Sequence, residues 1–161
     1  MQQVPIRSIS FTAHEEEKFD VRGPIEPIHL AAAKGDVDAV QRLIEEDGRR
    51  LNAMVKGDGD VFVNFSCVEG WTALSVAAYL GRDAVVKRLL ELGADTELRG
   101  DGNDGVTALY GACFSGRAST LALLLDGGAS VNAQAEGDFD CGCTPLINAA
   151  GYGHRVREAA H

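Results

Sequence analysis

The sequence predicts an all-α solenoid of about four helix-turn-helix repeats joined by β-hairpin-like loops. Four segments of the sequence each have a glycine at the same number of residues after the position where the segment begins. The pairs are Glu26 and Gly35, Thr72 and Gly81, Thr107 and Gly116, Thr144 and Gly153. A pair of apolar residues then recurs in register, at Leu43-Ile44, Leu89-Leu90 and Leu124-Leu125. Because two helices of about three turns or fewer cannot enclose a core, each unit must stack on its copies.

The unit at residues 70–95 shows the repeat most clearly. Thr72 can cap the first helix with its hydroxyl group, and Gly81 ends that helix. Gly93 ends the second helix, whose apolar residues recur with helical spacing. These apolar residues are Val85, Val86, Leu89 and Leu90. The same pattern places the repeats at about 24–53, 69–98, 104–133 and 142–161.

The other three units vary this pattern. In the first, Pro27 stands in the first helical turn, where its missing N–H costs nothing, and an apolar stripe predicts a second helix over 37–46. The third has an unusually apolar second helix over 118–125. The fourth begins at Thr144 but lacks the apolar pair after Gly153. It is either truncated, as in a fragment of a longer array, or a capping repeat with the polar outer face that terminal repeats need.

Two segments do not match the repeat. Residues 1–23 predict an N-terminal arm that is partly ordered or flexible. Residues 54–68 predict an inserted hairpin, with turn residues at 56–60 and an apolar strand at 61–65. A calcium loop is rejected for this insertion because its aspartates lack a third ligand at the required spacing and no glutamate closes the loop.

These patterns resemble the ankyrin repeat. Its signature, Thr-Pro-Leu-His-x-Ala, is nearly matched by residues 27–32 and 144–146, and its closing segment by 93–95 and 128–133. The resemblance covers residues 24–161 and implies an ankyrin-repeat solenoid. It also implies a concave face, built from hairpin tips and the exposed ends of the first helices, that grips another protein.

The composition excludes several classes of function. The chain has 161 residues, a net charge of −9 and a pI near 4.8, so it lacks the basic footprint that displaces counterions from nucleic acids. Its apolar runs are far shorter than the roughly 18 residues of a membrane span, and the first residues lack the apolar core of a signal peptide. We therefore predict a cytoplasmic or nuclear protein that binds neither nucleic acid nor membrane.

No motif predicts an enzyme, a metal site or a cofactor. The sequence has no phosphate-binding loop, no His-Glu-x-x-His and no Gly-x-Ser-x-Gly. His29 occupies the family's histidine position, where the resemblance implies a structural hydrogen bond. Cys113 aligns with core alanines, and the remaining cysteines lie in loops without zinc spacing. Because the sequence shows no secretory signal, we expect free thiols.

Counting from the start of each repeat gives the residues expected on the concave face. The hairpins contribute Glu69 and Trp71, then Asp101, Asn103 and Asp104, and finally Asp138 and Asp140. The helix ends contribute Tyr79, Leu80, Phe114 and Tyr152. Aromatic side chains beside acids suit an interface hot spot. The alternative for Tyr79 and Phe114 is that they only fill the groove between repeats.

We therefore predict a monomeric protein-interaction module, a scaffold whose partner presents basic side chains next to an apolar anchor. The aspartates of consecutive hairpins would add into one negative strip that speeds encounter with such a partner. The alternative is a structural spacer within a larger multidomain protein. An enzyme or a metal-binding protein is the least favoured function.

Overall fold

The computed structural model of the chain describes residues 27–54, 62–63, 66–67, 70–99, 107–133, 144–145 and 147. The predicted N-terminal arm and the turn at 56–60 lie outside these residues, as does the fourth repeat beyond Ile147. At the start of that repeat, the Thr144 hydroxyl oxygen accepts a hydrogen bond from the Ile147 backbone N–H at 3.4 Å.

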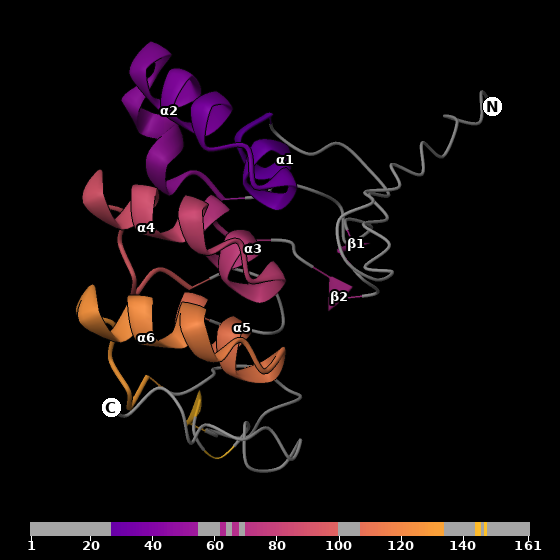
Figure 1. Cartoon of the computed structure of the whole chain (residues 1–161), viewed down its shortest axis with the longest axis vertical. Helices are drawn as coiled ribbons and strands as arrows, with labels where there is room; N and C mark the ends of the chain where they lie inside the picture. The colour runs from indigo at the N-terminus through magenta and orange to yellow at the C-terminus, as the bar shows by residue number, and fades with distance from the viewer. Residues whose placement is uncertain are drawn as a thin grey trace, which may run out of the picture.

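Helices in the described part of the chain form three consecutive pairs. They are α1 (Pro27–Lys34) with α2 (Val37–Glu46), α3 (Ala73–Leu80) with α4 (Asp83–Glu91), and α5 (Ala108–Phe114) with α6 (Ala118–Asp126). The pairs stack, so that α1, α3 and α5 form one row and α2, α4 and α6 form another (Figure 1). We call these the inner row and the outer row. The arrangement confirms the predicted all-α solenoid.

Helix boundaries in the inner row follow the predicted capping residues. The Thr72 side chain accepts a hydrogen bond from the Ser75 N–H at 3.2 Å, and Thr107 does the same for Tyr110 at 3.4 Å. Gly81 ends α3 with a φ of 67°, in the left-handed region that glycine enters at least cost. The recurrent threonine and glycine of the sequence therefore set where these helices start and stop.

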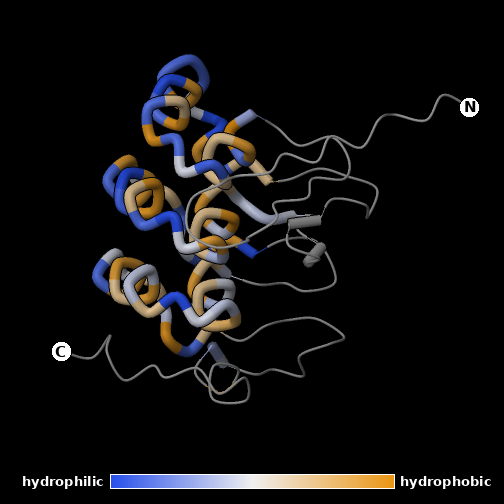
Figure 2. Tube along the Cα trace, turned by 45° about the vertical axis from the view of Figure 1, so that its right-hand side comes forward, coloured by the Kyte–Doolittle hydropathy of each residue, from blue (hydrophilic) through white to orange (hydrophobic). Residues whose placement is uncertain are grey.

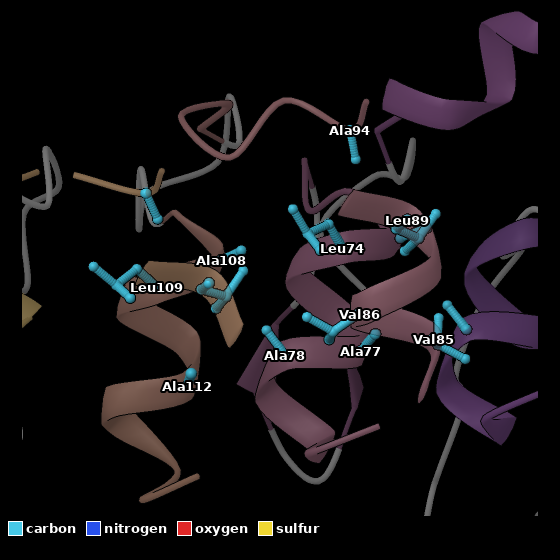
Figure 3. Packing of buried hydrophobic residues seen from close by; sticks show 14 of the residues in the cluster. Leu74, Ala77, Ala78, Val85, Val86, Leu89, Ala94, Ala108, Leu109 and Ala112 are labelled. Atoms are coloured by element: carbon cyan, nitrogen blue, oxygen red, sulfur yellow. The ribbon is translucent and has the colours of Figure 1, made fainter. Parts of the chain in front are cut away.

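The hydrophobic core lies between the two rows (Figure 3). Leu74 and Leu109 from the inner row pack in the same cluster as Val85 and Leu89 from the outer row. Small residues let the rows approach closely, and all of these alanines are buried: Ala31, Ala32, Ala77, Ala78 and Ala112. Hydrophilic residues gather on the outer row, most clearly on α2 and α4 (Figure 2).

The insertion after the first repeat contains a short antiparallel hairpin. Strand β1 (Phe62–Val63) pairs with β2 (Ser66–Cys67), with Phe62 opposite Cys67 and Val63 opposite Ser66. Residues 61, 64 and 65 of the strand predicted over 61–65 lie outside the described residues.

The two ends of this insertion meet at one β-bridge. Met54 follows the 3-10 helix η1 (Gly48–Asn52) closely and pairs antiparallel with Thr72, the capping residue of α3. The bridge therefore holds the end of the first repeat's segment beside the start of α3.

Candidate functional site

The structure describes four of the residues predicted for the concave face. These are Trp71, Tyr79, Leu80 and Phe114. The other seven lie outside the described residues: Glu69, Asp101, Asn103, Asp104, Asp138, Asp140 and Tyr152. The described part of the site is therefore the surface at the ends of the inner-row helices.

Three of the predicted aromatic residues form a continuous ladder. The Trp71 and Tyr79 ring centroids are 5.4 Å apart, with an interplanar angle of 72° that makes the contact edge-to-face. Tyr79 and Phe114 are stacked, with centroids 6.2 Å apart and an angle of 26°. Both distances fall in the range of favourable aromatic pairs. The structure therefore brings together side chains from two repeats that the sequence separates by more than thirty positions.

The members of this ladder differ in exposure. Tyr79 and Phe114 are partly exposed, at the carboxyl ends of α3 and α5. Trp71 has an exposed fraction of only 5%, and Leu80 of 2%. These two side chains leave little surface for a partner, so burial favours a packing role for them. The accessible part of the ladder consists of Tyr79 and Phe114.

Two arginines that the sequence analysis did not single out link successive repeats at this surface. The Arg82 Nε donates a hydrogen bond to the Ala33 carbonyl at 2.8 Å, and the Arg117 Nε donates to the Tyr79 carbonyl at 3.4 Å. Ala33 and Tyr79 occupy equivalent positions near the ends of α1 and α3, where helix carbonyls lack partners within the helix. The signal in the sequence was the recurrent Gly-Arg pair at residues 81–82 and 116–117.

The glycines that follow α1 and α3 lie against the arginine of the next repeat. A Cβ atom on Gly81 would lie 2.8 Å from the Arg117 Cδ, which is closer than Cβ atoms lie to neighbouring atoms in proteins. On Gly35 it would lie 3.5 Å from the Arg82 Cδ, in ordinary contact. Each arginine side chain therefore runs across the glycine of the preceding repeat to reach the carbonyl of Ala33 or Tyr79.

Burial changes the ionisation of two groups near this surface. It lowers the pKa of the Arg117 guanidinium because desolvation disfavours the charged form. It raises the pKa of the Cys113 thiol to about 11. A thiol with such a pKa is protonated at neutral pH and is a poor nucleophile. Cys113 is therefore a small buried residue of α5, as its alignment with core alanines predicted.

His29 makes the structural hydrogen bond that the family resemblance implied. Its ring is fully buried, and Nε2 lies 2.9 Å from the Ala53 carbonyl oxygen, to which it donates. The bond joins α1 to the segment that follows η1. Within the described ranges, no group of three or more His, Cys, Asp or Glu side chains is arranged to hold a metal ion. None of the described helices is long and apolar enough to cross a membrane.

Comparison with protein families identifies the solenoid. A family model described as "Ankyrin repeats (3 copies)" matches residues 11–100, and one described as "Ankyrin repeat" matches residues 104–136. The first match alone covers more than half of the chain. The protein belongs to the ankyrin repeat family, and its fold is an all-α ankyrin-repeat solenoid.

Two curated relatives share a segment with this chain. They are the ankyrin repeat and SAM domain-containing protein 6 of Rattus norvegicus and that of Mus musculus. Each is 41% identical over 73 residues, which is 45% of this chain and 7% of the relative. The similarity therefore concerns a small part of much longer proteins.

Proposed function

We propose that this chain is a protein-interaction module that holds its partner along the inner row, at the helix ends and the neighbouring hairpins. Ankyrin repeats are generally protein-interaction modules and are typically not catalytic. The observation that carries the proposal is the stacked pair of Tyr79 and Phe114, which are partly exposed on adjacent repeats. Large rigid aromatic rings supply contact area at low entropic cost, as in many interface hot spots.

The chemistry of the partner remains a proposal from the sequence. Asp101, Asp104, Asp138 and Asp140 belong to consecutive predicted hairpins, and a net charge of −9 adds to their field. Such a field favours a partner with basic side chains beside an apolar anchor. A monomeric state and a cytoplasmic or nuclear location belong to the same proposal.

Affinity capture with mass spectrometry tests the proposed surface. The wild type is compared with a Tyr79→Ala/Phe114→Ala variant and with a matched control, Arg42→Ala/Lys87→Ala. The control replaces two exposed side chains of the outer-row helices α2 and α4. We expect the aromatic variant to lose partners that the control retains, with a cost of about 2 kcal/mol or more if the pair is a hot spot. Partners that bind both variants as well as the wild type would refute the inner-row surface.

A further inference from the structure

The Arg82 side chain is held in one orientation at the carboxyl end of the inner-row helix α1. Its Nε donates to the Ala33 carbonyl at 2.8 Å, and its Cδ passes over Gly35, where a Cβ atom would lie 3.5 Å away. A guanidinium is planar, so fixing Nε also fixes the plane in which its two terminal nitrogens lie. The protein therefore presents these nitrogens without a further loss of side-chain freedom.

The terminal nitrogens of Arg82 keep their hydrogen-bonding capacity. Within the described part of the chain, Arg82 donates no hydrogen bond other than the one to Ala33 and takes part in no ion pair. The residue is partly exposed. An arginine in this state offers a fork of N–H groups whose geometry matches a carboxylate.

The carbonyl that anchors this fork lies one repeat before the carbonyl of Tyr79. The fork is anchored at Ala33, and Tyr79 occupies the equivalent position in the next repeat. Packed helices are about 8–10 Å apart, and three residues of a polyproline II segment span about 9 Å at about 3.1 Å each. Because this conformation has three residues per turn, side chains three positions apart lie on the same side, so a segment that adopts it can place one residue at Arg82 and another on the ring of Tyr79.

We propose that Arg82 binds an Asp or Glu side chain of the partner, three residues from an apolar side chain that contacts Tyr79. This inference rests on the proposed function and deepens it, because it places the acidic group of the bound segment toward the first repeat and the apolar group toward the second. A single carboxylate suits a chain whose net charge is −9, since a run of acids would be repelled.

Selection from a phage-displayed library of short random peptides tests this inference. Wild-type protein is the bait, and a synthetic peptide from the selection is then measured against wild type, Arg82→Gln and Arg42→Gln. Arg42 is a matched control because its Nε also donates to a backbone carbonyl, that of Asp38, but on the outer row. We expect selected peptides to carry Asp or Glu three residues from an apolar residue. Arg82→Gln should weaken binding about tenfold or more, and Arg42→Gln should leave it unchanged.

A peptide in which the acidic residue is replaced by its amide tests the same contact on the unaltered protein. The amide peptide should bind the wild type more weakly than the acidic peptide by the same factor. The two peptides should bind Arg82→Gln with equal affinity, as expected for two groups in contact. Peptides that lack a carboxylate, or whose binding ignores Arg82→Gln, would overturn the inference and leave the proposed function standing. If no peptide is enriched, or if binding survives Tyr79→Ala/Phe114→Ala, the proposed function fails and the inference fails with it.

Discussion

Replacing Leu89 by alanine should strongly destabilise the stack. Leu89 is fully buried on α4 and belongs to the cluster between the two rows. The change removes three carbon atoms, worth about 0.8 kcal/mol each or about 2.4 kcal/mol in transfer free energy. The cavity left behind adds to this, so the expected loss of unfolding free energy is about 2–5 kcal/mol. In a short array, whose repeats depend on their neighbours, such a loss is a large share of the total stability.

Urea unfolding followed by circular dichroism measures this loss. Lys87→Ala is the matched control, because Lys87 is exposed on the same helix and alanine favours helix at least as well. The denaturation midpoint should fall for Leu89→Ala and stay near the wild-type value for Lys87→Ala. A midpoint for Leu89→Ala that equals the control would show that the repeat register, and with it the assignment of the core, is wrong.

Two further predictions concern the glycines that end helices and the thiol of Cys113. Gly81→Ala and Gly93→Ala should each cost roughly 1–2 kcal/mol because both positions have a positive φ. Gly81→Ala should cost about 1 kcal/mol more, measured by the same urea titration, since its Cβ would displace the arginine that bonds across this glycine, whereas a Cβ on Gly93 meets nothing within 4 Å. Equal costs would refute the linking role of the arginine. The thiol of Cys113 should react slowly with iodoacetamide in the folded protein and rapidly in urea. Because its pKa rises from 9.0 to about 11 on folding, the protonated form favours the folded state, and this contribution should be lost as the pH rises from about 9 to about 11. Fast alkylation of Cys113 in the folded protein at neutral pH would contradict the expected slow reaction.

The sequence was sufficient to predict the solenoid because its signals repeat. One threonine before a helix or one glycine after it is weak evidence, but the same residues in register mark the boundaries of α3 and α5. Each unit must bury its apolar stripe on a neighbour, so periodicity predicts packing as well as helices. The insertion has no second copy, so its prediction rested on local composition alone.

The candidate site was predicted less well because exposure depends on packing that the sequence does not state. Counting positions brought Trp71, Tyr79 and Phe114 to one surface, and the ladder confirms that they lie together. Counting could not show that Trp71 is buried and that Tyr79 is partly exposed. Edge-to-face contact with Tyr79 uses surface of the tryptophan that would otherwise be available to a partner.

The arginine links also give the stack a direction. Arg82 and Arg117 each donate to the preceding repeat, but the equivalent residue of the first repeat is Asp36, whose side chain carries acceptor oxygens in place of the N–H groups of an arginine. Asp36 instead accepts a hydrogen bond from the Ala39 N–H at 2.9 Å and caps α2. One position in the repeat thus serves two purposes: a donor there joins a repeat to the one before it, and an acceptor there serves only its own helix. Only an arginine at this position places a guanidinium beside the preceding repeat. The carboxylate site proposed for Arg82 therefore cannot form at Asp36, the equivalent residue of the first repeat.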